Sequence, residues 1–168
     1  MFARCKRAAF FLALLVLLGP VACASSRAMN DERLRDALVT ETGGWEGKPG
    51  AWVFTYRDLE MMLLTDEHHN RMRIISPVAL EEALAPARMQ VLLGVNFDRT
   101  LDARYATWQG KLWAAFIHPL DSLTAGEARA GLDQVWNLVR NYGGSYASSD
   151  LAFNPAAEGE KGSDPTSQ

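Results

Sequence analysis

The sequence predicts an α+β protein with an antiparallel sheet and helices packed mainly on one face of that sheet. Segments with apolar residues at helical spacing are interspersed with short segments that alternate apolar and polar residues. Short polar turns join neighbouring strand candidates, which indicates hairpins rather than β-helix-β crossovers. The expected order is helix, three strands, helix, two strands, helix.

The N-terminal half supplies the first helix and three strands. The helix is expected over residues 31–42, with Asn30 as its N-cap and Gly43-Gly44 at its end. The segment "AWVFTY" alternates as a strand, and a turn at Arg57-Asp58 leads into "LEMMLLT". The polar cluster "DEHHN" is then a second turn before the strand "RMRIIS".

The next helix and the last two strands follow. Ser76-Pro77 has the signature of a helix start, with serine as the cap and proline at the first helical position. Pro86 predicts a kink or a restart within that helix. The strands "DARYATW" and "KLWAAFIH" are joined at Gln109-Gly110, and Pro119 ends the second strand because it lacks a ladder donor.

The final helix has the clearest local signal. Thr124 and Glu127 form a capping-box pattern, in which each side chain satisfies the other residue's backbone N–H. Gly143-Gly144 marks its end. Apolar residues recur between them at helical spacing, namely Leu132, Val135, Trp136, Val139 and Tyr142.

Residues 1–24 have the features of a signal peptide. Three basic residues precede an unbroken apolar run over residues 8–18, and Ala22-Cys23-Ala24 supplies the small-residue cleavage pattern. The apolar run is shorter than the roughly 20 residues that a membrane span needs. The sequence therefore predicts an exported protein, periplasmic or secreted, without a membrane span.

Two cleavage routes remain open. Cleavage after Ala24 would leave Ser25 as the first residue. Alternatively, residues 21–23 resemble a bacterial lipoprotein signal, in which Cys23 is lipidated and anchors the protein to a membrane. Pro20 stands where that pattern prefers leucine, which favours plain secretion.

The remaining chain is acidic and contains no cysteine. The whole chain has 17 basic and 20 acidic residues, and removing the three basic residues of the leader leaves 14 against 20, a net charge of −6. An acidic chain without a basic run is a poor candidate for nucleic-acid binding. Both cysteines, Cys5 and Cys23, precede Ser25, so the exported domain must be stabilised by its core rather than by disulfides.

The mature chain is expected to form one domain and a tail. Residues 25–153 are mixed apolar and polar throughout, at a length typical of one compact domain. Residues 154–168 contain no large apolar side chain and are predicted to be disordered.

No catalytic signature is present, and no cofactor is expected. His68 and His69 are neighbours on an extended segment and would point to opposite faces, so they do not form a metal site by themselves. His118 has no partner at short range that would make it a general base. The alternative to a non-enzymatic protein is a small metal-dependent hydrolase that uses His68, His69 or His118 with nearby carboxylates.

Two strands are apolar at consecutive positions, which suggests a binding surface. "MMLL" and "LWAAFI" place apolar side chains on both faces of the sheet, while the helices can cover one face. We expect the other face to be covered by a protein partner or by a second copy in a homodimer. The candidate interface residues are Met62, Trp113, Ala115 and Ile117, with Trp113 as the anchor. The alternative is that the two alanines leave little exposed area and a loop covers the rest.

Three arginines on the predicted strands leave a second question open. Arg71, Arg73 and Arg104 would form a small basic cluster if their strands are neighbours. The alternative is that they are solvated charges with local partners, because arginine is rarely buried.

The order of hydrophobic blocks resembles the YbjN family. The matching segments are "NRMRIISPV", "LLGVNF" and "ARYATWQGKLWAAFIHPLDSLT" followed by a capped helix, within residues 31–153. That family is similar in fold to the type III secretion chaperones, including the chaperone of the Tir effector. The resemblance implies a helix–β3–helix–β2–helix domain, often dimeric, that binds proteins and catalyses no reaction. Those chaperones act in the cytoplasm, so the export signal of this chain separates it from their role in secretion.

Export generates a direct prediction about the native N-terminus. Mass spectrometry of the protein from its native cells should find Ser25, or a lipidated Cys23, as the first residue, because residues 1–24 have the pattern that signal peptidases cleave. An intact cytosolic chain that begins at Met1 would contradict it.

Overall fold

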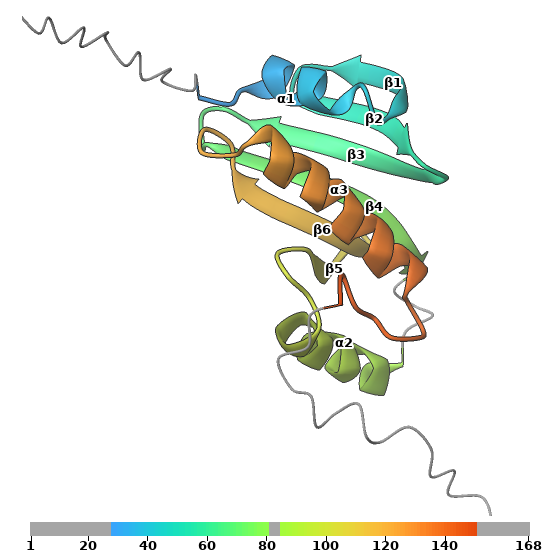
Figure 1. Ribbon diagram of the computed structural model, residues 1–168. Helices are drawn as coiled ribbons and strands as arrows, with labels where there is room; N and C mark the ends of the chain where they lie inside the picture. Colours follow the sequence, from blue (N-terminus) through green and yellow to red (C-terminus); the bar gives the residue numbers. More distant parts are fainter. Residues whose placement is uncertain (1–27, 81–84, 151–168) are drawn as a thin grey trace, which may run out of the picture.

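The computed structural model describes residues 28–80 and 85–150 (Figure 1). The predicted signal peptide over residues 1–24 and the predicted tail over residues 154–168 lie outside the described residues. The elements along the chain are α1 (Asp31–Leu38), β1 (Gly43–Lys48), β2 (Ala51–Tyr56), β3 (Leu59–Asp66), β4 (Arg71–Leu80), α2 (Pro86–Asp98), β5 (Arg104–Trp108), β6 (Lys111–Pro119) and α3 (Ala125–Arg140).

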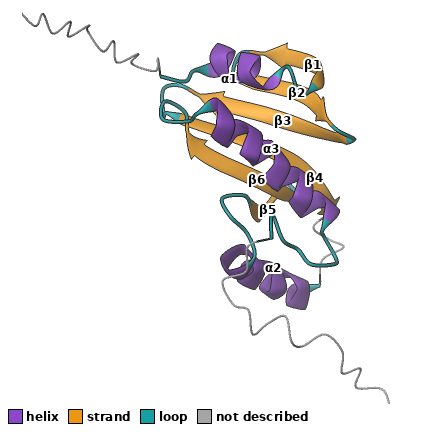
Figure 2. Cartoon of the chain, in the orientation of Figure 1, coloured by secondary structure: helices purple, strands orange, loops and turns teal. Residues whose placement is uncertain are grey.

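Six antiparallel strands form one sheet in the order β1-β2-β3-β4-β6-β5 (Figure 2). Helices α1 and α3 lie against the same face, and α2 lies beside the β5 edge (Figure 1). The predicted α+β class with helices mainly on one face is therefore confirmed. The pairing of β4 with β6 joins the N-terminal meander to the C-terminal hairpin.

The hydrophobic core lies between the sheet and helices α1 and α3. Every second residue of the central strands points into it, which follows from the two-residue period of a strand. The largest side chains in this layer are at most about 2 % exposed. They are Phe54, Met61, Leu63, Met72, Ile74, Leu112 and Phe116 from the sheet, and Leu34, Leu38, Leu132, Val135 and Leu138 from the helices.

The start of α1 is tied to the sheet by a buried carboxylate. Asn30 caps the helix as predicted, since its side chain accepts from the Arg33 backbone N–H at 3.0 Å. Asp31 is 4 % exposed. Its oxygens accept from the Gly50 N–H at 3.1 Å, from the Trp52 indole N–H at 3.0 Å and from the Thr65 hydroxyl. A buried charge needs such partners, and these bonds fix α1 to β2 and β3.

The start of α3 also agrees with the sequence. Thr124 Oγ1 accepts from the Glu127 N–H at 3.2 Å, and a Glu127 carboxylate oxygen accepts from the Thr124 N–H at 2.7 Å. The backbone N–H of Thr124, followed by its side chain, holds the pKa of Glu127 below its ordinary value, because hydrogen bonds to the carboxylate favour the charged form.

The predicted start of the second helix is wrong. Ser76 and Pro77 belong to β4, which continues to Leu80 and pairs with β6 across a register shift between Pro77 and Ala79. The β3 ladder ends at Ile75, so the missing N–H of Pro77 costs no bond to β3. The Ser76 hydroxyl donates to the Glu60 carbonyl at 2.9 Å instead of capping a helix. Helix α2 begins only at Pro86.

Two further differences lie near the N-terminus. Helix α1 ends at Leu38 rather than Thr42, and the Thr42 hydroxyl donates to the Leu38 carbonyl at 2.7 Å. The two glycines expected to end the helix instead open β1, a strand that the sequence analysis missed. Its pairing with β2 is irregular between Gly43 and Glu46, and this glycine-rich, mostly exposed edge strand carries no clear alternation.

Gly131 is a point of close contact between α3 and the sheet. A Cβ atom at this position would lie 2.7 Å from a ring carbon of Phe116, whereas one at Gly126 would have its nearest neighbour at 3.9 Å. Phe116 is 2 % exposed, so its ring cannot move aside freely. The absence of a side chain at residue 131 therefore sets how closely α3 approaches β6.

We expect Gly131→Ala to destabilise the domain by about 1–3 kcal/mol through this overlap, although alanine normally stabilises a helix relative to glycine. Gly126→Ala, in the same helix, should be neutral or stabilising by less than about 1 kcal/mol. Urea denaturation of both variants measures the difference. A Gly131→Ala protein as stable as the wild type would show that α3 packs less closely than described.

Candidate functional site

The sheet face opposite α1 and α3 carries a second set of apolar side chains. Cross-strand partners lie on the same face, and Met62 of β3 pairs with Ile75 of β4, which pairs with Ala115 of β6. A parallel row runs from Leu64 through Arg73 to Ile117. We call this surface the open sheet face, because helices α1 and α3 cover the other side (Figure 1). Its centre is a small buried cluster of Ile75, Trp113 and Ala115, against which Met62 and Leu64 pack.

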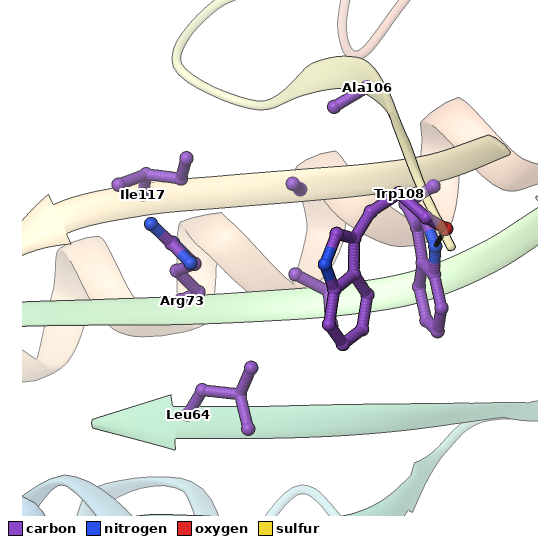
Figure 3. A pocket seen from close by; sticks show the side chains of 8 residues that line it. Leu64, Arg73, Ala106, Trp108 and Ile117 are labelled. Atoms are coloured by element: carbon purple, nitrogen blue, oxygen red, sulfur yellow. Dashed lines mark hydrogen bonds between the residues drawn. The ribbon is translucent and has the colours of Figure 1, made fainter. Parts of the chain in front are cut away.

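A shallow hollow of about 280 Å³ lies on the open sheet face (Figure 3). Two of its lining residues are small, and Ala106 and Ala115 leave room between much larger neighbours. In Figure 3, Arg73 lies between Leu64 and Ile117 at one end, and Trp108 lies at the other end. The lining residues are Leu64, Arg73, Ile75, Ala106, Trp108, Trp113, Ala115 and Ile117.

The two tryptophans of the hollow differ in their exposure. Trp113 is 9 % exposed, and its indole N–H donates to the Trp108 carbonyl at 3.0 Å. Trp108 is 53 % exposed and packs on Trp113 at a centroid distance of 5.9 Å. Trp113 is therefore part of the wall, whereas Trp108 and the 49 % exposed Ile117 present the apolar area that a partner could cover.

The structure brings the sequence-predicted interface residues together. Trp113, Ala115 and Ile117 line the hollow, and Met62 packs beside it. Whether they contact a partner stays a prediction. The other lining residues were not predicted to belong to the interface. The hairpin turn at Gln109-Gly110 was predicted correctly, and it would have placed Trp108 beside Lys111 on the same surface. Those unselected residues are Leu64, Arg73, Ile75, Ala106 and Trp108.

The histidines do not lie in the hollow. His68 and His69 lie in the β3–β4 turn, and the Nδ1 atom of His69 lies 2.7 Å from an Asp66 carboxylate oxygen. The backbone N–H of His69, followed by its ring, holds the pKa of Asp66 below its ordinary value. His118 stacks on Phe116 at a centroid distance of 6.0 Å, and its Nδ1 atom lies 2.7 Å from the Pro119 carbonyl oxygen.

A metal site would need more ligands than these. Within residues 28–80 and 85–150, no group of three or more His, Cys, Asp and Glu side chains is placed to hold a metal ion. The hydrolase alternative therefore has no ligand set in this part of the chain.

The edge of the sheet beside the hollow is partly occupied by a side chain of α2. The side-chain amide of Asn96, on α2, donates to the Tyr105 carbonyl at 2.9 Å and accepts from the Tyr105 N–H at 2.8 Å. Tyr105 lies on β5, the edge strand, so Asn96 occupies backbone groups that an added strand would use. The Tyr105 hydroxyl donates to the Leu138 carbonyl at 2.6 Å, and burial raises the pKa of this phenol.

Comparisons with known proteins leave the family unassigned. No family model matches the sequence, and no curated protein matches it either. Among solved structures, the fold is similar to a chain of the HopA1–SchA chaperone–effector complex, with 14 % identity and a TM-score of 0.46, over 68 % of this chain and 89 % of that chain. Membership of the YbjN family stays a prediction.

Helix lengths bear on the membrane question only for the described part of the chain. There, none of the helices is both long and apolar enough to span a bilayer.

The difference between the two tryptophans is testable by substitution. We expect Trp113→Ala to destabilise the domain by about 3 kcal/mol, because it removes a buried ring and leaves a cavity. Trp108→Ala should cost about 1 kcal/mol or less, since half of that side chain already contacts solvent. Thermal or urea denaturation checks both values. Equal losses for the two variants would mean that Trp108, too, supports the fold rather than presenting a surface.

Proposed function

We propose that this chain is a non-enzymatic protein-interaction domain, and that the open sheet face is its binding surface. One observation carries the proposal: a hollow on an apolar sheet face, with Trp108 and Ile117 about half exposed at its ends. Contiguous exposed apolar patches on soluble domains often mark interaction sites, and tryptophan contributes strongly to such interfaces.

The shape of the hollow favours side chains of a protein over a small-molecule ligand. Small-molecule pockets usually have about 300–1,000 Å³ and enclose most of their ligand. This hollow has about 280 Å³ and is open to solvent, so it would hold a few side chains of a partner.

The residues of the hollow also supply little for catalysis. Of the eight lining residues, Arg73 alone is ionisable, and none carries a hydroxyl, thiol, imidazole or carboxylate. Acid–base and nucleophilic mechanisms need such groups within reach of a substrate. This composition supports binding rather than chemistry at the site.

The partner is proposed to lie over the face rather than to extend the sheet. Asn96 already bonds the outward backbone groups of Tyr105, which removes the pairing groups of that residue from strand addition at the edge next to the hollow. The side chains of Trp108 and Ile117, by contrast, project from the face and remain about half exposed.

Export sets where such binding would take place. The leader pattern of residues 1–24 supports a periplasmic or secreted protein, or a lipoprotein anchored through Cys23. A partner would then be another protein of the same compartment. Self-association through the open sheet face is the other use that the sequence suggests, with a homodimer as the product.

Substitution on the open sheet face tests the proposal. We expect chains lacking residues 1–24 to retain specific proteins from the native cells, and Trp108→Asp/Ile117→Asp to lose them, because two carboxylates would disrupt the apolar contact. Leu93→Asp is the matched control, since Leu93 is 70 % exposed on α2, away from the hollow. Affinity capture with quantitative mass spectrometry measures retention, and circular dichroism confirms folding.

Two results would count against this surface. Retention of the same proteins by the double variant would place binding elsewhere. Loss of these proteins in the Leu93→Asp variant alone would assign the binding surface to α2. Light scattering at micromolar concentration examines self-association in parallel, and a dimer that the double variant dissociates would identify a second copy as the partner.

A further inference from the structure

We infer that the open sheet face selects a partner segment that combines large apolar side chains with carboxylates, and that Arg73 is the residue that reads the carboxylate. This inference rests on the proposed function and adds the chemistry of the partner. It is drawn from the position and the pairing of the basic side chains around the hollow.

Basic side chains surround the hollow on three strands. Arg73 lines it, opposite Leu64 and Ile117 in the two neighbouring strands. Arg104 lies on the same face because its cross-strand partner is Ala115. Lys111 lies at the other end, with its ammonium 5.9 Å from the centre of the Trp113 ring. Arg71 precedes Arg73 by two residues and therefore shares its face.

None of these four cations forms an ion pair with the described residues of the chain. The five ion pairs within residues 28–80 and 85–150 involve other basic groups, on Arg35, Arg57, His69, Arg129 and Arg140. The side chains of Arg71 and Arg104 donate to backbone carbonyls, and the Arg73 side chain forms no hydrogen bond in that part of the chain. The open sheet face is therefore locally basic, although the whole chain has a net charge of −3.

The carboxylates of the same face do not neutralise the hollow. Glu46 and Glu60 share this face through their partners on β2, but they lie on β1 and near the start of β3 and do not line the hollow. Asp66 is the cross-strand partner of Arg71, but it is bonded by the backbone N–H and the ring of His69 and does not line the hollow. A positive potential thus remains at the apolar surface, which favours acidic over basic partners.

Arg73 is suited to discriminate between partners. Its guanidinium lies beside Leu64 and Ile117 (Figure 3), so a docked apolar segment would exclude water around it. A carboxylate next to it would then form a charge-assisted, bidentate pair in a medium of reduced dielectric constant. A partner without a carboxylate would leave the desolvated guanidinium unpaired, at a cost in binding free energy.

An anionic lipid surface offers the same charge but fits the shape less well. Membrane-binding surfaces insert protruding apolar side chains, whereas this face is hollowed and three residues at its centre, Ile75, Trp113 and Ala115, are 9 % exposed or less. A concave apolar surface favours projecting side chains of a folded or helical partner segment.

Selection from a phage-displayed library of random 15-residue peptides tests the inference. Three targets are used, each lacking residues 1–24: the wild type, the Arg73→Glu variant and the Arg99→Glu variant. Arg99 is the matched control, since it lies at the end of α2 and lines a different depression. Only peptides whose binding is lost with Trp108→Asp count as ligands of the hollow.

We expect the wild type and Arg99→Glu to enrich peptides with large apolar residues flanked by Asp or Glu, and Arg73→Glu to lose this acidic preference. For a synthetic peptide from the selection, replacing its carboxylates by amides should weaken binding to the wild type about tenfold, by isothermal titration calorimetry, and should leave binding to Arg73→Glu unchanged or stronger.

The outcomes separate the inference from the proposed function. Trp108-dependent peptides without acidic enrichment would overturn the inference and leave the binding surface in place. The absence of any Trp108-dependent peptide would overturn both. A lipid surface would replace the peptide if the protein bound no peptide and bound phosphatidylglycerol vesicles, but not phosphatidylcholine vesicles, through Arg73. A dimer that depends on Trp108 would overturn the inference in favour of a second copy.

Discussion

The antiparallel pairing of β4 with β6 is the interaction on which the rest of this structure depends. The two strands are far apart in sequence, and their register sets Ile75 opposite Ala115, and Arg73 opposite Ile117. The same register sets Met72 and Ile74 on the core side, with Ile74 opposite the buried Phe116. A shift of β4 by one residue would exchange its two faces, so that Arg71 and Arg73 would enter the core and Met72 and Ile74 would leave it. The core and the candidate site therefore share one determinant.

The uneven distribution of helices turns that register into a site. Helix α3 packs closely over β4 and β6 because Gly131 lets it approach Phe116, and α1 is held beside it through the buried Asp31 carboxylate. Helix α2 is bound to the β5 edge by Asn96 instead of crossing to the opposite face. One face of the sheet is therefore tightly packed against α1 and α3. The open sheet face also carries apolar side chains, but no helix of the described residues covers them. Burying that second side would lower the free energy of the system, which is the physical basis of the proposed binding.

Apolar area and charge act together on this surface. Aromatic and aliphatic groups supply affinity without much direction, whereas a guanidinium between Leu64 and Ile117 adds a directional requirement. Most basic groups of the opposite side are paired with carboxylates, as with Arg57 and Asp133 at 2.8 Å or Arg129 and Glu41 at 2.7 Å. Arg73, by contrast, has no ion pair among the described residues and lies within an apolar surface.

The sequence alone determined those features that depend on neighbours along the chain. The Asn30 cap, the Thr124–Glu127 capping box and the hairpin turn at Gln109-Gly110 are local hydrogen-bond or dihedral preferences, and all were predicted correctly. Apolar residues at consecutive positions of "LWAAFI" likewise showed that both faces of β6 would be apolar. This is why Trp113, Ala115 and Ile117 could be assigned to one surface in advance.

Tertiary structure decided the features that depend on distant partners. Ser76-Pro77 has a sound local signal for a helix start, but pairing of β4 with β6 outweighed it, since a central strand gains cross-strand bonds and burial that a capped helix there would lose. The edge strand β1 has no alternation to reveal it, because Trp45 is its one large apolar residue. Its ladder with β2 and the stacking of Trp45 on Phe54 hold it in place. The roles of Trp108 and Trp113 were also beyond the sequence, because exposure is set by what packs from other strands. The same holds for Arg73: only the folded sheet places it in an apolar hollow, without a carboxylate partner among the described residues.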